Sequence, residues 1–201
     1  MNFIYPFQPP AILNKEVDTL LIDKINKQCD ELLPNKQELE ATSQLLDTFP
    51  HGDAVNIYYP IEELQKEIFE ASYYYIGSFE NTTNATIIPD GNRLNIVKMW
   101  FLDLYDKDYL NAHHHGGNLL SGIIYLKIPN VPKTSYPNGC IEFTYNPMVL
   151  PEKLINSNTF MLEPKEKQMY IWPSWLFHTV YPYYGNESRR SLSFNINIAP
   201  V

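Results

Sequence analysis

The sequence predicts a mainly β domain of the α+β class, in which N-terminal helices pack on an antiparallel sandwich or barrel. Apolar residues recur at helical spacing within about the first 75 residues. From about residue 86 onward, short β-type runs are separated by turns rich in Pro, Gly and Asn. Helices followed by antiparallel strands are typical of helices that cover one side of an all-β core.

We expect a single domain over residues 1–201, with a mainly helical part at 1–85 and a β core at 86–201. The chain is 44% hydrophobic and 14% aromatic, which excludes a disordered chain. Its apolar runs are shorter than the ~20 residues of a membrane span, and its start lacks a signal-peptide pattern. No membrane partner and a cytoplasmic location are therefore expected.

The net charge of −8 argues against duplex nucleic acid as a partner, because proteins that bind it carry a basic stripe. The two cysteines, Cys29 and Cys140, are too few and too far apart for a disulfide framework or a thiolate metal site. This cysteine usage fits a reducing compartment. These features leave the oligomeric state open.

Two helices are expected in the N-terminal part. The first ends at Pro34-Asn35 and has an apolar stripe of Val17, Leu20, Leu21, Ile25, Cys29 and Leu32. The second starts after Pro60, since proline suits a helix start. Its apolar positions are Ile61, Leu64, Ile68 and Tyr75. Each helix should bury one face.

Six strands are expected in the β core, each bounded by turn residues. They are Asn95–Tyr105, Leu119–Ile128, Cys140–Tyr145, Gln168–Trp172, His178–Tyr181 and Arg189–Ile198.

Histidines are concentrated at two places, the triplet His113-His114-His115 and the single His178. On a strand, His113 and His115 would point to one face and His114 to the other. Two imidazoles on one face and a third from a distant strand would form a nitrogen site for Fe(II), Zn or another divalent ion, with positions left open for substrate. A solvated polar loop and a buried core histidine are the plainer alternatives.

The last expected strand has two different faces. One is apolar and contains Leu192, Phe194 and Ile196, while Arg189 and Ser191 lie on the polar one. If the apolar face packs on helices, the polar face lines the barrel interior and implies a ligand pocket. Arg189 would then offer a cationic fork suited to a carboxylate. The alternative is a surface arginine on a solvated edge strand.

Tyr181–Ser188 is rich in turn residues and predicts a hairpin that would put His178 and Arg189 on neighbouring strands. That geometry suits a small dianion that binds a metal at one end and an arginine at the other.

These motifs together resemble the Fe(II)/2-oxoglutarate-dependent oxygenase superfamily, and within it a bacterial and phage group with a His-x-His motif. The resemblance covers residues ~95–198. It is carried by His113-His114-His115, Ser121-Gly122, Asn138-Gly139-Cys140, the run from Trp172 to Val180 that contains His178, and Arg189-x-Ser191-x-Ser193-Phe194-Asn195.

The resemblance implies a double-stranded β-helix core of the jelly-roll or cupin type, and a role for each matching residue. His113 and His178 match Fe(II) ligands, and His115 stands where the superfamily usually has a carboxylate. Arg189 matches the residue that binds the far carboxylate of 2-oxoglutarate, Ser191 its hydroxyl partner, and Tyr125 a further contact. Two alternative assignments remain open. His114 could be the metal ligand in place of His115, and Arg190 could bind the carboxylate in place of Arg189.

The activity implied is that of a non-haem Fe(II)- and 2-oxoglutarate-dependent dioxygenase, specifically a hydroxylase. It would use O2 to couple conversion of 2-oxoglutarate into succinate with oxidation of a substrate C–H bond. The motifs do not identify that substrate. A three-histidine metalloenzyme that does not use 2-oxoglutarate, and a non-catalytic binding or structural protein on the same fold, are the alternatives.

Overall fold

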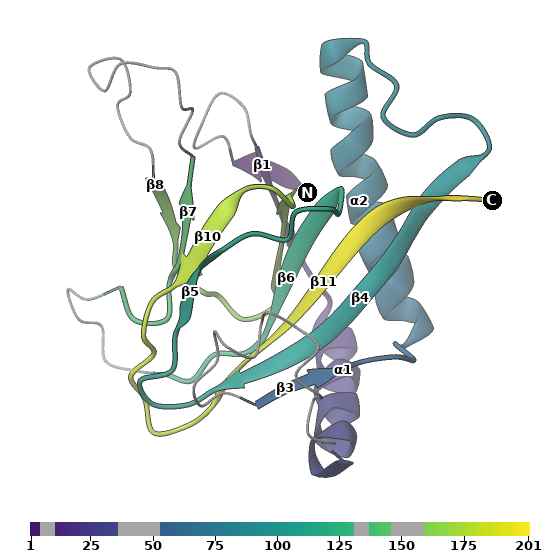
Figure 1. Cartoon of the computed structure of the whole chain (residues 1–201). Helices are drawn as coiled ribbons and strands as arrows, with labels where there is room; N and C mark the ends of the chain where they lie inside the picture. The colour runs from purple at the N-terminus through teal and green to yellow at the C-terminus, as the bar shows by residue number, and fades with distance from the viewer. Residues whose placement is uncertain (5–10, 36–52, 131–136, 146–158) are drawn as a thin grey trace, which may run out of the picture.

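The strands of the chain form two antiparallel sheets that face each other, and two helices cover the outer side of the larger one (Figure 1). This is a computed structural model that describes residues 1–4, 11–35, 53–130, 137–145 and 159–201. The larger sheet has seven strands in the order β1-β2-β9-β6-β11-β4-β3, and the smaller has four in the order β5-β10-β7-β8.

The larger sheet consists of β1 (Asn2–Ile4), β2 (Ile12–Glu16), β3 (Asp53–Asn56), β4 (Asn92–Leu104), β6 (Leu120–Lys127), β9 (Gln168–Pro173) and β11 (Arg189–Pro200). The smaller consists of β5 (Leu110–His113), β7 (Ile141–Thr144), β8 (Thr159–Leu162) and β10 (Phe177–Val180). Strands that follow one another along the chain join opposite sheets at several points, as in a jelly roll. The fold is a double-stranded β-helix with N-terminal helices, as the sequence predicted.

The two helices lie close to the predicted positions. Helix α1 (Thr19–Leu32) starts at Asp18, whose carboxylate accepts hydrogen bonds from two backbone N–H groups of the first turn, and a short 3-10 helix, η1 (Leu33–Asn35), follows it. Helix α2 (Glu62–Thr83) starts just after Pro60 and ends at Asn84, which is in the left-handed conformation. Among the residues expected to be buried, Leu20 is instead exposed. No helix in the described part of the chain is long and apolar enough to cross a membrane.

All six predicted strands are present, with ends that shift by a few residues. The prediction missed β1, β2, β3, β5 and β8, each only three to five residues long. Three of these come from the N-terminal part, which therefore contributes edge strands to the sheet as well as helices. Strands this short have little alternation of their own, and their pairing partners decide their position.

Strand β11 divides the two cores, as its alternation predicted. Leu192, Phe194 and Ile196 belong to the core between the larger sheet and the helices. The opposite face of β11 points into the barrel, where a second core contains residues of β4, β6 and β9 such as Leu102, Tyr125 and Trp172. The polar side chains of β11 are therefore next to the barrel interior.

The hairpin predicted for Tyr181–Ser188 is wrong. Strand β10 pairs with β5 and β7 in the smaller sheet, whereas β11 pairs with β4 and β6 in the larger one. The connection crosses from one sheet to the other, and the buried Tyr183 donates to the carbonyl of Glu187 within it. His178 and Arg189 therefore belong to opposite sheets of the barrel.

Candidate metal centre and cosubstrate site

Three of the predicted histidines meet inside the barrel. One ligand nitrogen from each of His113, His115 and His178 lies within 4.8 Å of the others. The ring centroids of His113 and His178 are 4.3 Å apart, and that of His115 is 5.1 Å from His113 and 5.2 Å from His178. The sequence predicted this grouping, and we call these residues the histidine triad.

Strand pairing and one backbone hydrogen bond place the triad. His113 and His178 are directly opposite each other on β5 and β10. The sequence predicted that His113 and His115 both lie on a strand. Strand β5 instead ends at His113, and His115 lies beyond it. The N–H of His115 donates to the carbonyl of Ser174 at 2.9 Å, and this bond holds the backbone of His115 beside the residue that follows β9.

His114 points away from the triad. Its ring lies 4.6 Å from that of Phe177, and its Nδ1 accepts a hydrogen bond from the N–H of Gly116 at 2.8 Å. The residue is exposed. The alternative in which His114 replaces His115 in the cluster therefore does not fit the geometry.

Backbone carbonyls orient two of the three rings. The Nδ1 of His113 lies 2.7 Å from the carbonyl oxygen of Asn111, and that of His178 lies 3.0 Å from the carbonyl oxygen of Leu176. Each Nδ1 donates its proton in these bonds, which leaves Nε2 with a free lone pair for a metal ion. This orientation is typical of metal-binding histidines.

Burial and mutual repulsion favour neutral imidazoles. Burial, with a contribution from His113, lowers the pKa of His115 to about 3. The same two causes lower the pKa of His178 well below its usual value, and burial lowers that of His113. None of these shifts involves a carboxylate. The triad is thus ready to bind a cation without first losing protons at neutral pH.

Aromatic rings enclose two sides of the triad. The ring of His178 lies 5.1 Å from that of Trp172 and 5.9 Å from that of Phe143. The ring centroid of Trp100 lies 5.7 Å from that of His115, and Trp100 is almost fully buried. The nearby Trp175 and Phe177 are about half exposed. Phe143 was missed because a single Phe on a four-residue strand has the same pattern as any core residue.

Arg189 is buried inside the barrel without a counter-ion among the described residues. Its exposed fraction is 1%, and its guanidinium carbon lies 5.0 Å from the centroid of the Tyr125 ring. Neither Nε nor Nη2 of Arg189, nor the hydroxyl of Tyr125, has a hydrogen-bond partner in the described part of the chain. Buried polar groups are nearly always hydrogen-bonded, so these atoms indicate a missing anionic ligand.

Strand register connects Arg189 with the triad. Ser191 is buried directly opposite Tyr125, and Ser193 is the next inward-facing residue of β11. Ser193 borders a small cavity of about 30 Å³ that the three triad histidines also line. The cavity has room for a metal ion or a water molecule.

Arg190 points the other way, toward the helices. Its Nε and Nη2 donate to the two carboxylate oxygens of the buried Asp103 at 2.7 and 2.8 Å, and its Nη1 donates to Asp30 at 2.7 Å. This fork-to-fork ion pair occupies the guanidinium. Arg190 is therefore not available as the alternative anchor that the sequence left open.

Sequence comparison agrees with this geometry. Residues 98–195, about half of the chain, match a family model described as "Putative 2OG-Fe(II) oxygenase". This region contains the triad, Tyr125, Arg189 and Ser191.

The chain belongs to the Fe(II)/2-oxoglutarate oxygenase superfamily. It is thus an oxidoreductase that uses Fe(II), 2-oxoglutarate and O2. No curated protein sequence matches this oxygenase.

Solved structures share its fold. A prolyl-4-hydroxylase from Pseudomonas putida has a TM-score of 0.59 at 12% identity, over 92% of this chain and 91% of its own. The viral collagen prolyl hydroxylase of Paramecium bursaria Chlorella virus-1, solved with 2-oxoglutarate, has the same score and identity, over 92% and 94%. The non-haem α-ketoglutarate-dependent epimerase SnoN of nogalamycin biosynthesis has a TM-score of 0.64 at 15% identity, over 94% and 79%. At these identities the likeness shows the fold alone.

The residues of the oxygenase fit its cofactor and cosubstrate. Three neutral imidazoles on one side of a cavity suit Fe(II) and leave other coordination positions open. The unpaired, buried guanidinium of Arg189 and the unpaired hydroxyl of Tyr125 suit one carboxylate of a dianion. Among the described residues no carboxylate joins the triad, so the charge of a bound divalent metal would be balanced by the 2-oxoglutarate dianion.

The low histidine pKa values predict that the metal-free oxygenase loses stability in acid. The unfolded chain takes up protons on histidine below pH ~6.5, whereas His115 stays neutral in the folded triad to about pH 3. The free energy of unfolding should therefore fall by about 1.4 kcal/mol per pH unit from His115, and the lowered pKa values of His113 and His178 act in the same direction. Urea unfolding of metal-free protein at pH 7 and pH 5 measures this. The His115→Gln variant should show a smaller fall, and an identical fall would contradict a depressed pKa at this residue.

Proposed function

We propose that this oxygenase is a hydroxylase in which the triad holds Fe(II) and Arg189 binds the far carboxylate of 2-oxoglutarate. His113, His115 and His178 would each contribute one nitrogen. Ser191 and Tyr125 would add hydroxyl contacts near the cosubstrate carboxylate. The observation that carries the proposal is the buried guanidinium of Arg189, which lies in the same barrel as the triad and has unpaired nitrogen atoms.

The chemistry comes from the bound metal and its cosubstrates, which convert 2-oxoglutarate into succinate and CO2 and oxidise a C–H bond of the substrate. The residues of the chain position these groups and exclude water. Arg189 and Tyr125 fix one end of the cosubstrate, which sets how its other end meets the triad. Trp172 and Phe143 close the site beside His178 and lower the local dielectric.

The test is a titration without oxygen. Fe(II) is added to the metal-free protein, and 2-oxoglutarate is then added while the visible spectrum is recorded. A saturable charge-transfer band is expected, because it reports chelation of the metal by the keto acid. Iron binding without a band would contradict the use of 2-oxoglutarate and favour a three-histidine metalloenzyme of another kind. If iron does not bind, the triad is not a working iron site.

A further inference from the structure

Lys98 of β4 is a partly buried cation at the edge of the triad. Its Nζ lies 5.2 Å from the centroid of the Trp100 ring, and the same ring lies 5.7 Å from that of His115. The Trp100 ring is therefore a neighbour of both the ammonium group and a triad residue.

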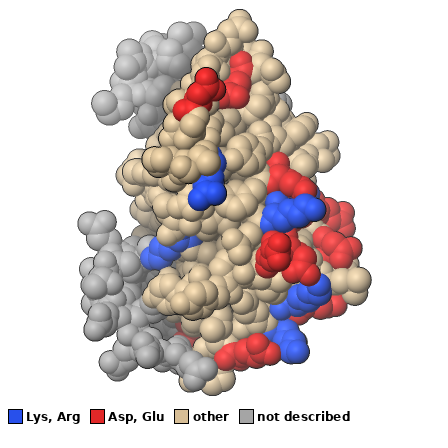
Figure 2. Space-filling model, turned by 90° about the vertical axis from the view of Figure 1, so that its right-hand side faces the viewer, with Lys and Arg blue, Asp and Glu red and all other residues tan. Residues whose placement is uncertain are grey.

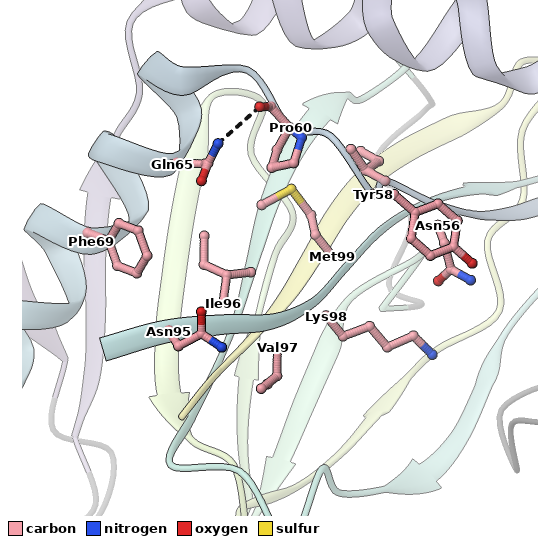
Figure 3. Close-up of a pocket in the computed structure, with 11 residues that line it drawn as sticks. Asn56, Tyr58, Pro60, Gln65, Phe69, Asn95, Ile96, Val97, Lys98 and Met99 are labelled. Carbon is pink, nitrogen blue, oxygen red and sulfur yellow. Dashed lines mark hydrogen bonds between the residues drawn. The ribbon is translucent and has the colours of Figure 1, made fainter. Parts of the chain in front are cut away.

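Lys98 lies on the face of β4 that carries Trp100, because the two residues are two apart and pair in unbroken register with Asn195 and Ser193 of β11. Lys98 is opposite Asn195 on β11 while Ile96 is opposite Ile196, so Val97 is an extra residue, a β-bulge. Ile96, Lys98 and Met99 all line the pocket beside helix α2, but the side chain of Lys98 extends away from those of Ile96 and Met99 (Figure 3). The bulge turns Ile96 to the same side as Met99 and leaves the face of Lys98 unchanged.

Lys98 has no carboxylate partner among the described residues. Its ammonium group makes no hydrogen bond or ion pair with those residues; it lies over the Trp100 ring, and burial lowers its pKa. The partly buried Lys15, by contrast, pairs with Glu67 at 2.7 Å, and the buried Arg190 pairs with Asp103. Figure 2 shows a face on which acidic and basic side chains mostly gather together, and a broad uncharged area has only isolated basic groups. A partly desolvated ammonium without an acid is unusual on a chain with a net charge of −8.

We propose that Lys98 anchors a carboxylate of the primary substrate, which is therefore a small carboxylic acid. This inference rests on the proposed function, because it places the substrate next to the triad. Arg189 is reserved for 2-oxoglutarate inside the barrel, so the substrate needs a cation of its own at the rim. A single ammonium balances a monoanion, whereas phosphate groups are usually bound by several donors. The substrate carbon that is oxidised would lie a few bonds from the carboxylate, because Lys98 and His115 are both neighbours of the Trp100 ring.

The test compares acids with their neutral amides. The probes are N-acetyl-L-amino acids and the same compounds as primary amides, so each pair differs only in the charged group. Binding is measured by calorimetry without oxygen, on protein with Fe(II) and saturating 2-oxoglutarate, which keeps Arg189 occupied. At least one acid should bind about tenfold tighter than its amide, since charge-assisted hydrogen bonds contribute this much.

Two variants separate the role of Lys98 from general charge. Lys98→Met keeps the apolar stem over Trp100 and should bring the acid and its amide to within twofold. Arg93→Met removes one positive charge from an exposed position on the same strand and should keep the preference for the acid. Both variants should form the charge-transfer band at the wild-type concentration of 2-oxoglutarate, which shows that the cosubstrate site is intact.

Equal binding of every acid and its amide by the wild-type protein would overturn the proposal, and so would an unchanged preference in Lys98→Met. If the wild-type protein shows no charge-transfer band, the proposed function fails separately. The comparison of acids with amides is then made on the metal-free protein, where the same two results decide the role of Lys98.

Discussion

Replacing His178 with Ala is expected to abolish stoichiometric Fe(II) binding. His178 is almost fully buried, its Nδ1 is committed to the carbonyl of Leu176, and its other nitrogen faces His113 and His115. Removing a partner of a ligand already costs about 10–100-fold in metal affinity, so loss of the ligand itself should cost more. Iron content after anaerobic gel filtration measures the result.

The neighbouring His114 provides the matched control. His114→Ala removes an imidazole one residue away from two triad members but outside the cluster, and it should retain one equivalent of Fe(II). A folded His178→Ala protein that keeps one equivalent would refute the assignment of ligands. Loss of iron in His114→Ala together with retention of iron in His115→Ala would show that His114, and not His115, is the third iron ligand. His178→Gln provides a second test if the Ala variant does not fold.

Replacing Arg189 with Met is expected to weaken 2-oxoglutarate binding by at least tenfold while leaving Fe(II) binding unchanged. A bidentate ion pair in a dry pocket contributes on the order of 1.5–3 kcal/mol, and each 1.4 kcal/mol is a factor of ten in affinity. Met fills much of the space of the arginine stem but has no charge. Titration of the charge-transfer band with 2-oxoglutarate gives the affinity.

The same substitution should have a different effect on stability. In the ligand-free protein Arg189 is a buried cation without a counter-ion in the described part of the chain, so its removal should maintain or raise the free energy of unfolding. Arg189→Lys keeps the charge but loses the fork, and its affinity should lie between those of wild type and Arg189→Met. An unchanged affinity in Arg189→Met would show that another group binds the cosubstrate carboxylate.

Local sequence patterns predicted most of the fold and the candidate site. The alternation of β11 has a period of two over a long strand, so it separated the helix-facing Leu192 and Phe194 from the inward-facing Arg189 and Ser191. The same alternation was expected to bring His113 and His115 together; the two do meet, but His115 lies beyond the end of β5, and the hydrogen bond from its N–H to Ser174 helps to position it. The prediction for β11 needed only the geometry of a strand.

Features that depend on distant parts of the chain could not be predicted in this way. The turn residues of Tyr181–Ser188 show that the chain bends but not which sheet the next strand joins, so a crossing between sheets was taken for a hairpin. Strand β5 has one buried residue among four, and its pairing with β10 defines it. A lysine in a strand pattern predicts a solvated side chain, and only the tertiary structure brings Lys98 over Trp100.

The all-imidazole triad also affects which metal the molecule carries. Neutral nitrogen ligands accept Fe(II), Co, Ni, Cu and Zn, and such sites bind most of these competitors more tightly than Fe(II). In the described part of the chain, no carboxylate or thiolate joins the three histidines. Selection for iron must then come from the supply of metals around the protein. Material purified over a nickel resin, or expressed in zinc-rich medium, would arrive loaded with a competing ion and would need a chelator followed by anaerobic iron before its activity is judged.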